Sequence, residues 1–273
     1  MRCNVYDRWG VEMSTTITAA LQSPVNAYLT QQASQSAAAT TSASSGAAGT
    51  KNPSTDTITL SDTAKEMAAQ ATSWASMSQL QLQSIYNSSW KTFVQFDANF
   101  SAQGNKVIYA DERTSGTPAE LAFTKKIANY MVSVHTIPTG NVANPYAGAS
   151  RAMVTSIMYD TSGKYTTSER YAAGEEQGQQ DYTYLSNLFA SIPTDPDQRK
   201  MYQGLLDYYN ALSPVEKSVS PGGYQEQVGA YLNQQETLFG VLSKKDVASV
   251  AQAMSTVFNE STVLGSTSTS TLQ

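Results

Sequence analysis

Apolar residues recur every three or four positions along most of the chain between residues 61 and 260. This spacing places them on one side of a helix, because an α-helix turns once in 3.6 residues. The longest run follows a turn at residues 160–163 and continues to Ile192, with a polar face that carries Glu176, Gln177, Gln180 and Asn187. Its predicted packed face consists of Tyr171, Gly178, Tyr182, Leu185, Phe189 and Ile192.

Helix start signals precede most of these runs. Thr166 can cap the backbone of Glu169, and the Glu169 side chain can reach back to the cap residue, as in a capping box. The same arrangement predicts helix starts at 117–120, 195–198, 213–216 and 243–246. The sequence therefore predicts an all-α fold: seven or so helices in one irregular multi-helix bundle.

Two segments depart from this pattern. The run from Ser61 to about Phe100 is long for one helix, and helix propensity falls at residues 87–89, so a break is expected there. Residues 107–109 are the one convincing strand-like run nearby. Within the long run, Trp74 and Trp90 are more typical of core anchors than of ligand platforms.

Composition divides the chain into three parts. No charged residue occurs between Ser14 and Thr50, where Ala, Ser, Thr and Gln dominate, so residues 1–56 are predicted to be a disordered head and linker. Residues 57–260 form the helical domain, with a split into two subdomains considered near 136–150. Residues 261–273 are predicted to be a disordered tail. Met13 is a more natural start than Met1, which makes residues 1–12 either a gene-model extension or a short ordered arm.

Charge and cysteine content exclude several classes of protein. The net charge is −5 and there is no basic cluster, which disfavours nucleic-acid binding. No apolar run approaches the roughly 18 residues that a membrane-spanning helix needs. Cys3 is the only cysteine, so disulfides within the chain and multi-cysteine zinc sites are set aside. Neither start gives a standard signal peptide, so a cytoplasmic location is the default and export without a cleaved signal stays open.

Carboxylates are the remaining catalytic candidates. His135 is the only histidine, and a cap or partly buried polar role fits its position better than a general base. No phosphate-binding loop, dinucleotide fingerprint or zinc-protease motif occurs, and no cofactor is expected. Paired carboxylates in a cleft would suit the hydrolysis of glycans. The candidates are Glu169, Glu175 and Asp181, with Asp160, Glu176 and Glu112 also considered.

Residues 160–169 also offer a candidate ion site. Asp160, Ser162, Thr166 and Glu169 supply oxygen atoms of the kind that bind calcium. An EF-hand loop that began at Asp160 would need glycine at its sixth position and glutamate at its twelfth, and both positions are tyrosine here. A capped helix that follows a surface turn is the alternative interpretation.

Residues 56–65, Asp-Thr-Ile-Thr-Leu-Ser-Asp-Thr-Ala-Lys, follow the Ser/Thr/Ala-rich head. This segment resembles one found in bacterial flagellar-associated and type III-exported proteins, including the flagellar anti-sigma factor. The resemblance covers about ten residues. It implies a bacterial origin and export through a narrow channel in an unfolded state, and it carries over no functional residue.

Three functional hypotheses follow. The first is a non-enzymatic helical interaction protein whose partner is another protein, of flagellar or exported type. The second is a carboxylate-based hydrolase that acts on glycans. The third is a calcium-stabilised helical protein. The sequence leaves the oligomeric state and the identity of the partner open.

Overall fold

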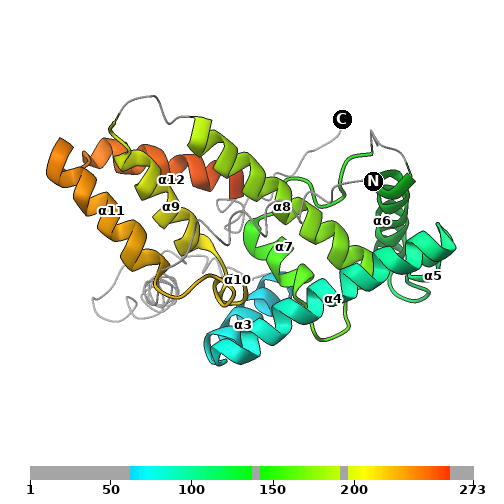
Figure 1. Ribbon diagram of the computed structural model, residues 1–273. Coiled ribbons are helices and arrows are strands. Elements are labelled where there is room, and N and C mark those ends of the chain that lie inside the picture. Colours follow the sequence, from blue (N-terminus) through cyan, green and yellow to red (C-terminus); the bar gives the residue numbers. More distant parts are fainter. Residues whose placement is uncertain (1–61, 137–141, 191–195, 259–273) are drawn as a thin grey trace, which may run out of the picture.

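A computed structural model describes residues 62–136, 142–190 and 196–258 of the chain (Figure 1). Within these ranges the protein contains helices and no strand, which confirms the predicted all-α fold class. The predicted disordered head, the Met13 start and the predicted tail lie outside the described residues. The helices are α3 (Asp62–Ala75), α4 (Gln79–Gln103), α5 (Lys106–Ala110), α6 (Pro118–Thr136), α7 (Arg151–Met158), α8 (Thr167–Ala190), α9 (Arg199–Ala211), α10 (Pro214–Lys217), α11 (Tyr224–Phe239) and α12 (Lys244–Phe258).

The predicted capping boxes form at three helix starts. At α6, the backbone N–H of Thr117 donates to the Glu120 carboxylate at 2.7 Å, and the N–H of Glu120 donates to the Thr117 hydroxyl at 3.3 Å. These bonds satisfy backbone donors that have no partner inside the helix. The same reciprocal pair forms at α8 and α10: Thr166 with Glu169, and Ser213 with Glu216.

Other predicted boundaries need correction. Helix α4 runs unbroken through residues 87–89, and the break falls instead at 76–78, where Ser78 forms a capping box with Gln81. The helix continues because Ser89 faces the core, where it accepts a hydrogen bond from Arg170 at 2.8 Å. The predicted strand at 107–109 is also wrong. This segment belongs to α5, a short helix that buries Ile108 completely.

The predicted start of α9 also differs. Gln198 precedes the helix and makes no capping bond with its side chain. Asp195, which was expected to cap this helix, lies outside the described residues. The described part contains ten helices rather than seven or so, partly because α5 was predicted to be a strand. The short helix α10 starts at the predicted cap, Ser213.

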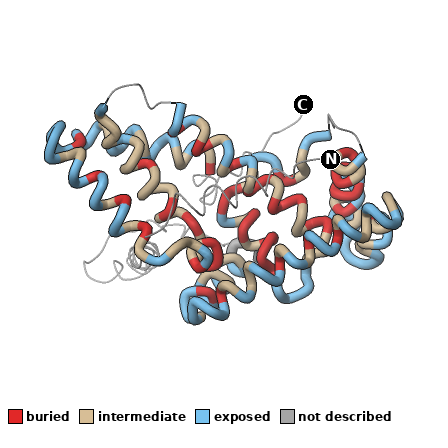
Figure 2. Tube along the Cα trace, in the orientation of Figure 1, coloured by how far each residue is buried: buried red, intermediate tan, exposed pale blue. Residues whose placement is uncertain are grey.

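Helix α8 runs through the middle of the molecule (Figure 1). It packs against α4, α6 and α7 along one part of its length and against α9 and α12 further on. Helices α9, α11 and α12 lie together at one end, and α4, α5 and α6 lie at the other (Figure 1). Figure 2 shows that buried segments concentrate along α7, α8 and α10, whereas α11 is largely exposed.

Three clusters of buried apolar side chains follow this arrangement. The largest joins α3 to α8 and includes Trp74, which confirms the predicted core role of that residue. The other two lie between α8, α9, α11 and α12 and meet at Leu205 and Tyr208. Tyr146, in the described part of the segment 136–150, is buried in the largest cluster. The split near 136–150 stays a prediction.

The buried face of α8 differs from the predicted one. Tyr182 is 55% exposed and Phe189 is 41% exposed, although both were assigned to the packed face. Glu176, Gln177 and Gln180, which were assigned to the polar face, are instead buried. Leu185 is buried as predicted, and Ile192 lies outside the described residues.

Glu176 and Gln180 have hydrogen-bond partners in the loop before α7, and Gln177 has partners on α7 and α10. Gln180 donates to the carbonyl of Ala149 at 2.8 Å, and Glu176 accepts from the N–H of Gly148 at 3.3 Å. A buried polar group is tolerated when it is hydrogen-bonded. A pattern based on hydrophobicity alone therefore selects the wrong face of this helix.

Arg151, the first residue of α7, lies at the centre of a buried polar network. It is 3% exposed and donates to Asp181 on α8 at 2.6 Å, to the Gln177 carbonyl at 3.1 Å, and to Glu216 on α10. Burial raises the pKa of Asp181, and the charge of Glu216 adds to this, while Arg151 opposes it. The side chain of Phe258 on α12 covers the guanidinium group at 5.0 Å.

Gly204 marks a close approach between α8 and α9. The Tyr184 hydroxyl donates to the Gly204 carbonyl at 3.0 Å. A Cβ atom at position 204 would lie 2.5 Å from Cδ1 of Leu188 and 3.2 Å from the Tyr184 oxygen. Any side chain at this position therefore has to displace buried groups of α8.

We expect Gly204→Ala to lower the free energy of unfolding by about 1–3 kcal/mol, the usual cost of overpacking a core. Thermal melting monitored by circular dichroism measures the change. Gly229→Ala in α11 is the matched control, since no atom lies within 4 Å of the added methyl group. That variant should gain about 0.5–1 kcal/mol from helix propensity. Equal shifts in the two variants would contradict a close approach at Gly204.

Candidate functional site

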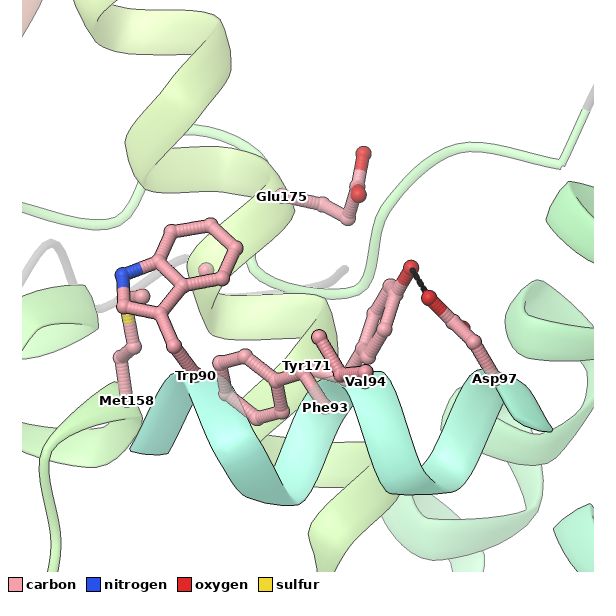
Figure 3. A pocket seen from close by; sticks show the side chains of 8 residues that line it. Trp90, Phe93, Val94, Asp97, Met158, Tyr171 and Glu175 are labelled. Carbon is pink, nitrogen blue, oxygen red and sulfur yellow. Dashed lines mark hydrogen bonds between the residues drawn. The ribbon is translucent and has the colours of Figure 1, made fainter. Parts of the chain in front are cut away.

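A small pocket opens in the groove between α4 and α8 (Figure 3). Its empty volume is about 350 Å³ when the open mouth is included, and its interior has room for only one or two water-sized groups. Trp90 and Tyr171 stand on either side, and Glu175 extends over the space from α8 (Figure 3). The lining residues are Trp90, Phe93, Val94, Asp97, Met158, Tyr171, Gly174 and Glu175.

Aromatic rings form the walls and hold one another in place. The Trp90 and Phe93 rings meet edge to face at 6.0 Å, and the Phe93 and Tyr171 rings do so at 5.3 Å. Such pairs stabilise a cluster by about 0.5–1.5 kcal/mol beyond the area that they bury. Phe93 is buried and Trp90 is only half-buried, so Trp90 both supports the core and faces the pocket.

Two carboxylates, Asp97 and Glu175, belong to the pocket lining. The Tyr171 hydroxyl donates to Oδ2 of Asp97 at 3.5 Å. Burial raises the pKa of Tyr171 far above its usual value, and the charges of Asp97 and Glu175 add to this effect. Tyr171 therefore stays protonated and acts as a donor.

His135 contacts two residues of the pocket lining, Asp97 and Tyr171. Its Nδ1 lies 2.8 Å from the carbonyl oxygen of Met131, and its Nε2 lies 3.1 Å from Oδ1 of Asp97. Both of these oxygens are hydrogen-bond acceptors, so the ring is held between two acceptor groups. The ring also packs 4.5 Å from Phe100. These contacts match the partly buried polar role that the sequence predicts.

No lysine or arginine occurs among the residues that line the pocket. The guanidinium of Arg170 lies 5.8 Å from the centre of the Phe93 ring. Arg170 donates to Ser89 at 2.8 Å and to the Met158 carbonyl at 3.1 Å, which anchors it in the interface between α4, α7 and α8. The lining itself therefore carries acidic groups and no basic one.

Glu169, a predicted catalytic and metal-binding residue, has a structural position. It is 2% exposed and accepts two hydrogen bonds from Arg113, at 2.8 and 2.6 Å. The carboxylate of Asp111 accepts hydrogen bonds from the first backbone N–H groups of α8 at 3.3 and 2.5 Å. These carboxylates attach the start of α8 to the loop between α5 and α6, with the stabilising sign expected for negative charge at a helix N-terminus.

The other residues of the predicted calcium site are engaged separately. The Asp160 carboxylate accepts hydrogen bonds from the N–H and hydroxyl of Ser162 and from the N–H of Gly163, at 2.7–3.2 Å. Thr166 is used by the capping box with Glu169. Within the described ranges, no group of three or more His, Cys, Asp or Glu side chains could hold a metal ion. The geometry matches the alternative prediction, a capped helix that follows a turn.

The remaining predicted carboxylates fall into different places. Asp181 belongs to the Arg151 network, and Glu176 is buried near Gly148, where burial raises its pKa. Glu175 is the one member of the predicted catalytic set that lines the pocket. The structure therefore separates Glu169, Glu175 and Asp181 rather than bringing them to one site.

Asp97 and Trp90 are the pocket residues that sequence reasoning missed as a site. Their spacing of seven residues, with Phe93 and Val94 between them, places all four along one side of a continuous helix. The predicted break at 87–89 precedes all four residues, so it did not hide this face. Trp90 was assigned to the core and Asp97 was given no role, because the other wall of the pocket, Tyr171, lies on a helix far away in the sequence.

None of the described helices is both long and apolar enough to cross a membrane. The chain matches no protein-family model, no curated protein and no solved structure. The functional argument therefore depends on the geometry of the molecule itself.

The pKa of Lys217, on α10, departs strongly from the ordinary value of a lysine. Its ammonium group donates to the Asn210 carbonyl at 2.8 Å, at the end of α9, and lies 5.2 Å from the Tyr209 ring centre. Burial lowers the pKa of Lys217 to about 7, against a smaller opposing effect of Glu216. Lys217 therefore caps the C-terminus of α9 but is costly to bury when charged.

We expect the stability of the protein to rise with pH between about 7 and about 10 through Lys217. Over this interval the unfolded chain holds the proton while the folded chain has released it, so raising the pH favours folding. Lys217→Met should flatten this rise, measured by denaturant unfolding at several pH values. Lys244→Met on α12 is the control, and an unchanged slope in Lys217→Met would contradict the assignment.

We also expect Glu169→Gln to lower the free energy of unfolding by about 2–3 kcal/mol, since it leaves Arg113 without its charged partner. Glu112→Gln, one residue from Arg113 in sequence, is the matched control and should change stability by no more than about 0.5 kcal/mol. Thermal melting of each variant, with and without calcium, provides the measurement. A calcium-dependent rise in melting temperature that Glu169→Gln abolishes would restore the metal-site hypothesis.

Proposed function

We propose that this chain is a non-enzymatic helical protein that binds another protein at the pocket between α4 and α8. The observation that carries the proposal is the pocket itself, a narrow aromatic recess with two carboxylates and a 65% exposed Val94 in its lining. Hydrophobic anchors beside charged groups are typical of the centre of a protein interface. A recess of this size suits one side chain of a partner better than a whole small-molecule substrate.

Charge supports a basic partner. The whole chain has a net charge of −5, and the pocket lining includes Asp97 and Glu175 but no lysine or arginine. Complementary charge speeds association and excludes wrong partners. The partner is therefore a protein segment that presents at least one basic side chain next to apolar ones.

The resemblance at residues 56–65 extends the proposal to a biological setting. It supports a bacterial protein of the flagellar-associated or exported type, whose Ser/Thr/Ala-rich head precedes a folded binding domain. Residues 62–65 begin α3, and the rest of the segment lies outside the described residues.

A glycan hydrolase is the second candidate, favoured by one observation. Asp97 and Glu175 line the same aromatic pocket, as a pair of catalytic carboxylates would. Two features weigh against it: the interior is small, and Asp97 already bonds His135 and Tyr171. Turnover of glycoside substrates that Glu175→Gln abolishes would favour this candidate over the binding protein.

A retention experiment tests the binding proposal. The full chain is immobilised and exposed to an extract of the cells that produce it, beside Glu175→Lys and Glu226→Lys. The second variant makes the same charge reversal at an exposed position of α11. We expect a protein that binds the wild type and Glu226→Lys but binds Glu175→Lys about tenfold more weakly, because like charges then meet at the pocket.

Circular dichroism of each variant verifies that the fold is intact. Retention of the same proteins by all three chains, or by none of them, would contradict binding at this pocket.

A further inference from the structure

The pocket between α4 and α8 has the chemistry of a receptor for an alkylammonium group. Rings of Trp90, Phe93 and Tyr171 belong to its walls, and carboxylates of Asp97 and Glu175 belong to its lining. Aromatic faces attract cations through their negative charge distribution, and ammonium groups are recognised by such rings in many proteins. We propose that the pocket binds the side chain of a lysine from the partner protein, an inference that rests on the proposed function.

Size distinguishes lysine from the other basic side chain. The interior admits one or two water-sized groups, which fits a terminal ammonium but not a flat guanidinium with its three nitrogen atoms. The lysine stem is apolar over four carbons and can lie against exposed Val94 at the mouth. In this arrangement the apolar stem of the lysine contacts a ring and its ammonium group lies near carboxylates. Both parts of the side chain then have suitable surroundings.

Groups of the chain that contact the lining limit where the cation can sit. Arg170 lies 5.8 Å from the centre of the Phe93 ring, and its charge disfavours a second cation close to that ring. His135 and the Tyr171 hydroxyl both bond the Asp97 carboxylate. Glu175 reaches over the space from α8, so its carboxylate lies where an ammonium group would enter (Figure 3).

A titration with small probes tests this proposal on the full chain. The probe is Nα-acetyl-lysine N-methylamide, and the signal is the indole N–H resonance of Trp90 in a ¹H–¹⁵N spectrum. The Trp90→Phe variant assigns this resonance, because the chain has three tryptophans. We expect a saturable shift with the lysine probe and none with the norleucine analogue, which has a stem of the same type but no charge.

Two variants and two further probes sharpen the result. Glu175→Gln should weaken the lysine probe by about fivefold, whereas Glu226→Gln should leave its affinity unchanged. The arginine analogue should bind more weakly than the lysine probe. Butylammonium, which lacks the peptide groups, should bind no more tightly than the lysine probe; tighter binding would mean that the pocket serves a free amine, which overturns a protein lysine as the occupant.

Equal shifts with the lysine and norleucine probes, or no saturable shift with lysine, would overturn the inference without requiring any variant to fold. Its failure can be told apart from that of the proposed function. If a protein is retained in a Glu175-dependent manner but the lysine probe does not bind, the binding function stands and lysine recognition falls. If the probe binds but no protein is retained, the pocket recognises an alkylammonium group and the proposed protein-binding function falls.

Discussion

The fold depends on satisfying one buried positive charge. Arg151 begins α7 inside the protein, where an uncompensated ion would cost several kcal/mol. Its partners come from three other helices: Gln177 and Asp181 from α8, Glu216 from α10 and the Phe258 ring from α12. The positions of these helices are linked because each must supply its group within a few ångströms of one guanidinium.

This requirement explains why α8 buries a polar face. Gln177 donates both to Thr155 of α7 at 3.2 Å and to Glu216 at 2.6 Å, so it connects the partners of Arg151 to one another. The small side chains of Ala172 and Ala173 on the same helix are fully buried, and they let neighbouring helices approach. Other residues of α8 pack against other helices. Tyr171, for example, packs against Phe93 of α4.

The sequence predicts this fold well where local chemistry decides and poorly where tertiary partners decide. Capping boxes such as Thr117 with Glu120 were found because both partners lie within four residues of each other. Ser89 and Ile108 were misjudged because a buried serine hydroxyl and a short helix depend on residues far away in the sequence. For the same reason, hydrophobic periodicity cannot identify a helix face whose polar side chains find partners on other elements, such as Gly148 for Glu176 and Ala149 for Gln180.

The candidate site shows the same limit. Acidic side chains near the start of α8 were all plausible catalytic or metal-binding groups from their chemistry alone. What separates two of them from the others is a distant cation: Arg113 pairs with Glu169, and Arg151 pairs with both Asp181 and Glu216. Those carboxylates hold helices together, and their charge is already compensated within the fold.

Glu175 lines a pocket that has no lysine or arginine in its lining. Asp97 in the same pocket is bonded to His135 and to the Tyr171 hydroxyl. Aromatic walls lower the local polarity and strengthen any charge interaction inside. Arginine pairs with Glu169, Asp181 and Glu216, whereas the aromatic recess has two carboxylates and no lysine or arginine in its lining, a combination that suits a positively charged side chain of the proposed partner.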